Sequence, residues 1–389
     1  MATWILVFSL ITGQIIKIPG GTGGGLTVLD ITIIFLNIVA LFSLKFKLKK
    51  PPLWLFSAFI FLFFASLSLL FTPLNLTITQ YLTSFTYTLR IANFFLFGWV
   101  ILSGSFPKIL ENAGKILIFS GIGMAFSGLF QLIFLPDLSF LAREGWDPHF
   151  FRTASTLLDP NFTGGYLALT LILLATSLGK LLPQKLLISF FVVVYIAFVT
   201  TFSRSAALFF IISFSTLSYL KKSLKLFILG FILFTGFFFI FNTYQKTIAA
   251  PRNIDRESSA QARIDTWQQG IEIFKRSPIL GVGFNSYRFA LEQYELTPSE
   301  FLQSRGSSTN DSSLLYILAT TGILGFLSYI VFLTLAAKQA VKSKSTWGLM
   351  FVAGLSGLIF NSFFVNSLFY PWFLFWLILT AVKTETDKD

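Results

Sequence analysis

The chain has 389 residues, of which 54% are hydrophobic and only 12% are charged, with a formal net charge of +12. Roughly 25% of the residues of a soluble domain are charged, so this composition excludes a soluble globular protein and predicts an integral membrane protein. The chain has no cysteine and one histidine, His149, which excludes disulfides and a multi-histidine metal site within one chain. The basic residues lie between apolar runs, so we expect no nucleic-acid partner.

Apolar runs long enough to cross a bilayer recur along the whole chain. A spanning helix needs about 20 such residues, because lipid cannot satisfy exposed backbone polar groups. We predict an all-α polytopic membrane protein with about twelve spans, and we interpret the first run as a helix rather than a cleaved signal, since no basic residue precedes it. The predicted spans are 2–16, 26–44, 53–72, 80–103, 115–135, 162–179, 186–202, 204–220, 224–242, 312–336, 347–365 and 367–382.

Three regions follow from these spans. Residues 1–242 hold the first nine spans, residues 243–310 form a long loop, and residues 311–389 hold the last three spans and a tail. A second long connection covers about 136–161. All other connections are short, so we expect soluble-phase chemistry in these two segments.

Lysine and arginine separate by side of the membrane. If there are twelve spans, the lysine clusters fall on one side, which the positive-inside rule makes cytoplasmic, with both termini. They are Lys45–Lys50, Lys108 and Lys115, Lys180 and Lys185, Lys221–Lys225, Lys338–Lys344, and Lys383 and Lys388. The loop arginines fall on the outer side, and they are Arg143, Arg152, Arg204, Arg252, Arg256, Arg263, Arg276, Arg288 and Arg305. Arginine grips phosphate or carboxylate through two parallel hydrogen bonds. Pairing with loop carboxylates is the structural alternative for about half of them.

Arg90 lies inside the fourth span, whose outer half is rich in threonine and serine. That face is too polar for lipid and predicts a wet cavity. Charged residues within spans are costly and usually functional. Asp30, near the outer end of the second span, is a possible partner, and a purely structural Arg90–Asp30 pair is the alternative.

Two short outer segments combine arginine with turn-forming residues. In the first, Arg152 precedes the turn Asp159-Pro-Asn161, which is typical of a helix start. The alternative is that Asp159 or Asn161 serves only as a helix cap. In the second, Arg204 stands between two serines, a setting polar enough for a small anion site. A snorkelling arginine at a helix end is the alternative there.

The long loop carries a helical pattern between Ser258 and Ile279. Its apolar residues recur at steps of three and four, and they are Ala260, Ile264, Trp267, Ile271 and Phe274. This amphipathic helix carries Arg263, and the alternative is a helix lying on lipid head groups. The Gly281-Val-Gly283 sequence that follows is weak evidence for phosphate binding.

Asn310 and Asp311 begin the tenth span. Either residue is suited to capping the helix. The functional hypothesis is that Asp311 is a carboxylate held beside the arginines at the lipid interface, where it can act as a general base.

Together these segments resemble the O-antigen ligase and polymerase superfamily, the Wzy/WaaL-like membrane glycosyltransferases. The resemblance rests on Arg152 through Asp159-Pro-Asn161, Ser203-Arg204-Ser205, Arg263-Ile-Asp-Thr-Trp267 through Gly283, and Asp311 through Gly322-Ile-Leu-Gly325. It covers the second half of the chain, and it implies a GT-C-like fold in the cytoplasmic (inner) membrane with an extracytoplasmic active site.

The resemblance also implies a reaction. Members transfer a glycan from an undecaprenyl-pyrophosphate carrier to an acceptor hydroxyl on a glycan or lipid, as in lipopolysaccharide and polysaccharide biosynthesis, and need no metal or other cofactor. The two key arginines of the ligases match Arg204 and Arg263. The position of the ligases' histidine corresponds to Asp311, so this chain departs from the ligase pattern at the residue expected to be the general base. His149 does not match that position.

We therefore expect Arg204, Arg263 and Asp311 to be catalytic, with Arg90, Arg152, Asp159, Asn161 and Asn310 binding substrate. Fixed arginines would stabilise the leaving pyrophosphate without a metal, and direct displacement would invert the anomeric centre. The alternative is a transporter or flippase of an anionic glycolipid or sugar, and a non-catalytic scaffold is a weaker third reading.

Overall fold

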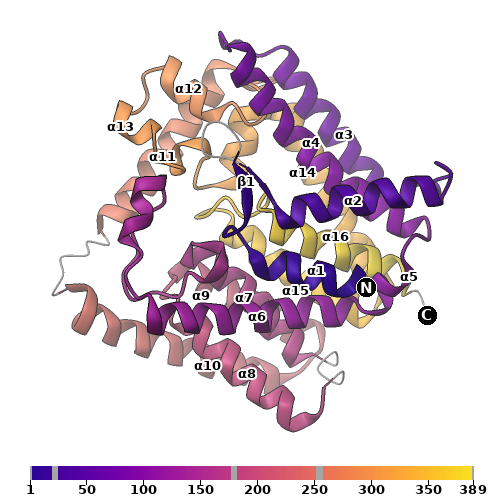
Figure 1. Cartoon of the computed structure of the whole chain (residues 1–389), viewed down its shortest axis with the longest axis vertical. Coiled ribbons are helices and arrows are strands. Elements are labelled where there is room, and N and C mark those ends of the chain that lie inside the picture. The colour runs from indigo at the N-terminus through magenta and orange to yellow at the C-terminus, as the bar shows by residue number, and fades with distance from the viewer. Residues whose placement is uncertain (1, 20–24, 177–181, 251–256, 388–389) are drawn as a thin grey trace.

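The computed structural model describes residues 2–19, 25–176, 182–250 and 257–387 (Figure 1). Of the charged residues considered above, Lys180, Arg252, Arg256 and Lys388 lie outside this range. The described part is mostly helical. Its strands β1 (Lys17–Pro19) and β2 (Gly25–Thr27) pair as an antiparallel hairpin before the second long helix.

A helix overlaps each predicted span range, and the recurrence of apolar helices is that of a multi-pass membrane protein. Among the described residues, five helices are long and apolar enough to cross a membrane, and six apolar helices are shorter. The twelve helices that match the predicted ranges are α1 (Ala2–Thr12), α2 (Val28–Ser43), α3 (Leu53–Leu70), α4 (Ile78–Leu102), α6 (Ala113–Phe134), α7 (Pro160–Ala175), α8 (Gln184–Val199), α9 (Arg204–Leu220), α10 (Leu224–Tyr244), α14 (Ser313–Ser343), α15 (Thr346–Asn361) and α16 (Pro371–Thr386).

The helices differ in how much of their surface the protein covers. Along α16 every residue from Pro371 to Val382 is buried, whereas α10 buries only Gly230, Phe237, Phe241 and Tyr244. Figure 1 shows α10 at the edge of the helix bundle and α16 near its middle. Because helices that are apolar all round can face either protein or lipid, hydropathy alone does not separate central from peripheral helices.

The segment after the loop helix enters the bundle and pairs with a break in α14. Gly322 has φ 62° and ψ −168° inside that helix, which frees backbone groups on either side. The Val282 and Gly283 N–H groups donate to Ala319 O and Thr320 O at 3.1 and 3.0 Å, and Ile323 N–H donates to Pro278 O at 2.9 Å. These bonds satisfy the backbone at the break, as an apolar environment requires. Gly281-Val-Gly283 thus makes intramolecular contacts here.

The long loop folds into short helices at one end of the bundle. They are α11 (Glu257–Arg276), α12 (Tyr287–Gln293) and α13 (Ser299–Leu302). In Figure 1 they lie at the upper left, while α1 begins and α16 ends at the right. The other long connection holds the short helices η1 (Ser139–Glu144) and η2 (Ser155–Leu157), and α5 (Pro107–Glu111) joins α4 to α6.

Helix α11 forms within the range that the apolar periodicity predicts, but it turns a different face inward. Gly270 and Ile273 are buried, whereas Ile264 and Ile271 are 45% and 41% exposed. Trp267 packs on Phe364 with 6.0 Å between ring centroids. The edge of the predicted apolar stripe that carries Ile264 and Ile271 is therefore exposed, which suits contact with the membrane surface.

Candidate functional site

The turn before α7 is built around Asp159. Its Oδ1 accepts hydrogen bonds from the backbone N–H groups of Asn161 and Phe162 at 2.6 and 3.1 Å, with Pro160 at the first helical position. This is the capping role that the sequence left open for Asp159. Burial raises the pKa of the Asp159 carboxyl, while its two backbone donors and Arg152 act in the opposite direction. The carboxylate is thus a fixed part of the turn.

Arg152 ties this turn to the start of α9. Its Nε donates to the carbonyl oxygen of Thr201 at 2.9 Å, and its Nη1 lies 3.4 Å from His149 Nδ1. The backbone supports the same junction, because Thr153 N–H donates to Thr200 O at 2.9 Å. The contacts of Arg152 hold the two arginine-bearing segments together.

Asn161 links the two helix starts directly. Ser203 Oγ donates to Asn161 Oδ1 at 2.7 Å, and Ser203 also caps α9 by accepting from Ala206 N–H at 3.3 Å. Arg204 is the first residue of α9, and its side chain is exposed. Within the described part of the chain, its guanidinium makes no hydrogen bond or ion pair.

Asn310 anchors α11 to the start of α14. It is fully buried, and its Nδ2 donates to the carbonyl oxygen of Thr266 and to Tyr287 Oη, the latter at 2.8 Å. Its Oδ1 accepts from Ser312 N–H at 2.8 Å. A Cβ at Gly270 would lie 2.8 Å from Asn310 Nδ2, so glycine permits the close approach of α11. Asn310 therefore has a positioning role rather than a free amide.

Asp311 is next to this anchor and does not cap the helix, because Ser312 takes that position. Its Oδ2 accepts a hydrogen bond from Thr266 Oγ1 at 3.4 Å. Burial raises the pKa of Asp311 to about 6, and Arg263 is the main group that opposes the shift. The negative charges of Asp147 and Asp159 also raise this pKa, whereas the hydrogen bond from Thr266 lowers it. The carboxyl group is therefore a stronger base than an exposed aspartate.

Arg263 lies on α11 within electrostatic range of the same groups. Burial lowers the pKa of its guanidinium. The negative charge of Asp311 raises this pKa, and the positive charge of the neighbouring Arg204 lowers it further. Its guanidinium has no hydrogen-bond or ion-pair partner among the residues that the structure describes. Arg263 is thus in electrostatic range of both Asp311 and Arg204, and neither guanidinium has an ion-pair partner among the described residues. Two like charges in proximity favour a bound anion.

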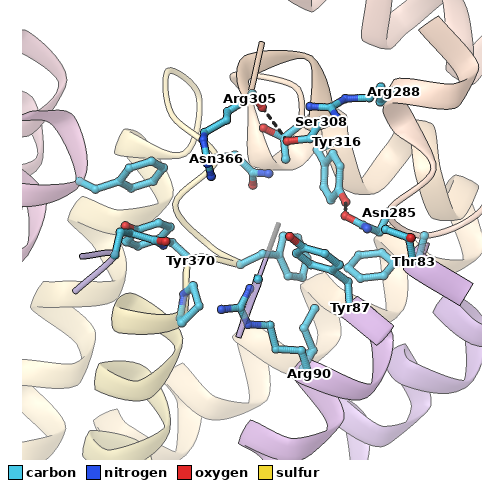
Figure 2. A pocket seen from close by; sticks show the side chains of 18 of the residues that line it. Thr83, Tyr87, Arg90, Asn285, Arg288, Arg305, Ser308, Tyr316, Asn366 and Tyr370 are labelled. Carbon is cyan, nitrogen blue, oxygen red and sulfur yellow. Dashed lines mark hydrogen bonds between the residues drawn. The ribbon is translucent and has the colours of Figure 1, made fainter. Parts of the chain in front are cut away.

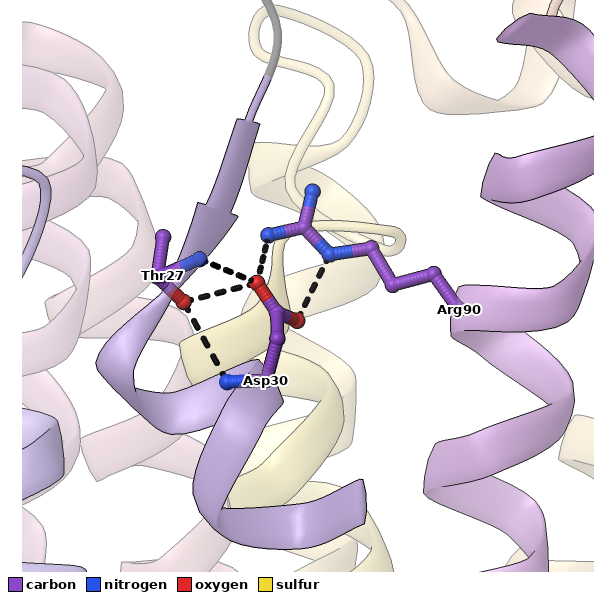
Figure 3. A network of polar contacts seen from close by, with 3 residues as sticks. All are labelled: Thr27, Asp30 and Arg90. Carbon is purple, nitrogen blue, oxygen red and sulfur yellow. Dashed lines mark hydrogen bonds and ion pairs between the residues drawn. The ribbon is translucent and has the colours of Figure 1, made fainter. Parts of the chain in front are cut away.

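Arg90 is held by Asp30, as the sequence suggested. Figure 3 shows Arg90 Nε donating to Asp30 Oδ1 at 2.7 Å and Nη2 donating to Oδ2. Asp30 Oδ2 also accepts from the N–H and hydroxyl of Thr27, at 2.8 and 2.7 Å. Asp30 is 1% exposed and Arg90 is 15% exposed. The pair fixes where the guanidinium points.

A cavity of about 250 Å³ lies beside Arg90 (Figure 2). Thr83 and Tyr87 of α4 line it, in agreement with the polar face expected there, as do Ser308 and Thr309 just before Asn310. Tyr370, which also lines it, is in electrostatic range of both Asp159 and Arg90. The cavity therefore lies next to the group of residues formed by Asp159, Arg204, Arg263 and Asp311.

The structure brings together Arg204, Arg263, Asp311 and Asp159, with Arg152, Asn161 and Asn310 supporting them, while Arg90 belongs to the cavity. Sequence reasoning missed Thr266 and the cavity residues Lys17 and Trp146. Thr266 follows Arg263 by three residues and so shares its helix face, a signal that was present. Lys17 and Trp146 come from separate connections, and no sequence pattern joins them.

Residues 188–330 match a family model described as O-antigen ligase. The matched range includes Arg204, Arg263 and Asp311. A search of curated proteins found no match to the chain.

Proposed function

Because residues 188–330 place the chain in the O-antigen ligase and polymerase superfamily, we propose that it transfers a glycan from an undecaprenyl-pyrophosphate carrier to an acceptor hydroxyl. The observation that carries this proposal is that Arg263 lies in electrostatic range of both Arg204 and the carboxylate of Asp311, while neither guanidinium has an ion-pair partner among the described residues. The reaction is of the polymerase or ligase type, since both need the same grip on the donor.

Arg204 and Arg263 bind the pyrophosphate in this proposal. Negative charge builds on the pyrophosphate oxygens as the anomeric bond breaks, and fixed cations stabilise that charge without reorganising. Arg204 is held at the first turn of α9, and Arg263 is held on α11 through the anchor that Asn310 makes. Arg152 and Asn161 keep the α7 turn against α9, so they support the binding of the donor indirectly.

Asp311 acts as the base toward the acceptor. The acceptor oxygen attacks the anomeric carbon, its proton passes to the Asp311 carboxylate, and undecaprenyl pyrophosphate leaves with the electron pair of the broken C–O bond. A single displacement of this kind inverts the anomeric centre. With a pKa of about 6, Asp311 is mostly ionised at neutral pH and close to the range in which general bases work best.

The reaction takes place on the outer face of the cytoplasmic membrane in this proposal. In Figure 1 the start of α1 and the end of α16 lie on the opposite side of the bundle from α11–α13, and the order of the spans assigns the lysine clusters to that same side. The lysine asymmetry makes that end cytoplasmic. The exposed Ile264 and Ile271 of α11 would keep the site at the lipid surface, where a polyprenyl carrier enters.

The test uses the purified full chain in detergent with an undecaprenyl-pyrophosphate-linked glycan. We expect release of undecaprenyl pyrophosphate, measured by mass spectrometry, together with a longer or newly attached glycan. Arg204→Ala and Arg263→Ala should each lower the rate by at least about 100-fold, as expected when a charge-stabilising group is removed. Arg276→Ala is the matched control, because that outer arginine already lies 3.5 Å from Glu272.

Full activity in both arginine variants would overturn their assignment. The transport alternative gives a different result in liposomes, where glycolipid would change leaflet without a new glycosidic bond. A scaffold would keep its supporting effect on envelope assembly in a folded Arg204→Ala variant.

A further inference from the structure

The cavity beside Arg90 has a strongly basic lining. Four cationic side chains border it, and no aspartate or glutamate is among its described lining residues. Asp30 compensates Arg90 from outside the cavity. The basic residues are Lys17, Arg90, Arg288 and Arg305. In Figure 2 Arg305 and Arg288 lie above the space and Arg90 below it. Four partly buried cationic side chains around one space favour a bound anion.

Lys17 gives the clearest indication of the kind of ligand that the cavity suits. Its Nζ is buried and has no hydrogen-bond partner among the described residues. It lies 5.5 Å from the centroid of the Trp146 ring, and Arg305 lies 4.5 Å from the same ring. Burial and Arg305 lower the pKa of the Lys17 ammonium, and only Glu144 opposes them. Two cations are thus gathered on one aromatic side chain.

Further polar atoms around the cavity are buried without a partner in the described structure. Trp146 Nε1 is a donor and Asn366 Oδ1 is an acceptor. Buried polar groups are normally paired. A ligand that satisfies Lys17 and Trp146 must accept hydrogen bonds, and one that satisfies Asn366 must also donate one. A carboxylate and a neighbouring hydroxyl on one molecule meet both needs.

Much of the remaining lining is aromatic. Tyr87, Phe162, Phe284, Tyr316 and Phe369 surround the space. Aromatic faces pack well against the C–H faces of a sugar ring, whereas a bare inorganic polyanion gains nothing from them. A volume of about 250 Å³ is small beside the pockets of drug-sized ligands, which run to about 300–1,000 Å³, and suits about one sugar unit.

We propose that this cavity binds a carboxylate-bearing sugar residue of the glycan substrate. The inference rests on the proposed function and adds a charge requirement to it. Lys17 and Arg305 pair with the sugar carboxylate, Asn366 accepts from a ring hydroxyl, and Asp30 keeps Arg90 aimed at the same space. Ser308 and Thr309 connect this pocket to Asp311 along the chain.

The test measures binding without any lipid-linked donor, so it is independent of catalysis. The full chain in detergent is titrated with digalacturonic acid by calorimetry. Two further probes are its uncharged methyl ester and inorganic pyrophosphate. We expect the diacid to bind and the ester to bind at least about tenfold more weakly, as loss of a charge-assisted pair implies. We also expect pyrophosphate to leave binding of the diacid unchanged.

Variants assign the binding to this cavity. Lys17→Gln should weaken diacid binding about tenfold or more, and Lys17→Arg should retain it. The matched control is Lys246→Gln, which removes an exposed lysine outside the cavity. Because the Lys17 ammonium makes no hydrogen bond within the described residues, Lys17→Gln should leave the melting temperature unchanged or higher, whereas loss of a structural lysine would lower it.

Several results would overturn the proposal. They are no binding of the diacid, equal binding of the ester, displacement by pyrophosphate, or Lys17→Gln binding like the wild type. Displacement by pyrophosphate would make the cavity a phosphate site. If the wild-type chain binds the diacid but transfers no glycan from the lipid-linked donor, the proposed function fails while the sugar site stands.

Discussion

Arg90 of α4 and Asp30 of α2 form a two-point ion pair, with Nε donating to Oδ1 at 2.7 Å and Nη2 donating to Oδ2. The Thr27 hydroxyl and N–H complete the shell of the carboxylate. Asp30 is almost fully buried, so it depends on these partners. The pair joins two helices and at the same time orients a guanidinium toward the cavity.

Replacing Arg90 with leucine should destabilise the protein by about 3–5 kcal/mol, because a buried carboxylate is left without its counterion. The double variant Arg90→Leu with Asp30→Asn should recover much of that loss, since it removes the stranded charge. Thermal unfolding in detergent checks both. Equal stability of the single and double variants would contradict a buried charge pair.

Asp311 should govern the acid limb of the pH–rate profile. The carboxylate must be ionised to accept a proton, so kcat/KM should fall about tenfold per pH unit below the pKa, which is about 6. Asp311→Asn should abolish transfer at every pH. Donor binding, measured separately, should persist because the arginines remain. A profile that is flat down to pH 5 would exclude Asp311 as the base.

The same carboxyl should lower stability at neutral pH. Its folded-state pKa of about 6 lies above the value of about 3.9 for an exposed aspartate. The ionised form therefore destabilises the fold above pH 6, and this effect is relieved as the pH falls through that value. Asp311→Asn should raise the melting temperature by roughly 2 °C or more at pH 7.5, and by less at pH 5.

Gly322 should not tolerate a side chain. It has φ 62°, and a Cβ would overlap the backbone of Ile279. Gly322→Ala should prevent the Pro278–Gly283 segment from pairing with α14 and so reduce the yield of folded protein. The control is Gly306→Ala, where the nearest atom would be 3.6 Å from the new Cβ. Size-exclusion chromatography and melting temperature compare the two, and equal behaviour would contradict the close approach.

Asn310→Ala should release α11 without unfolding the bundle. The change removes the donors to Thr266 O and Tyr287 Oη and the acceptor for Ser312 N–H. Hydrogen exchange should rise along α11, and transfer activity should fall with Arg263 no longer held. Asn112→Ala, at an exposed amide that donates within its own turn, should change neither. Unchanged exchange in α11 would show that other contacts suffice.

Part of the candidate site could be predicted from the sequence because its residues sit at helix starts. Asp159, Ser203-Arg204 and Asp311 each precede or open an apolar run, and polar residues with turn chemistry mark such positions. Arg263 was found from the period of a helix. The anchoring contacts of Asn310 were not predictable, since they depend on the contact between α11 and the start of α14.

The sequence by itself determined the membrane class, the apolar helices and the uneven distribution of lysine and arginine, because these follow from local composition and the thickness of a bilayer. It also suggested the Arg90–Asp30 pair, since an intramembrane charge needs a partner. Only the tertiary structure decided which face of α11 is buried, how Gly281 and Gly283 pair with the break at Gly322, and that Lys17, Trp146 and Arg305 meet at one cavity. Those contacts join segments far apart in the chain, and packing and backbone hydrogen bonding, rather than local pattern, select them.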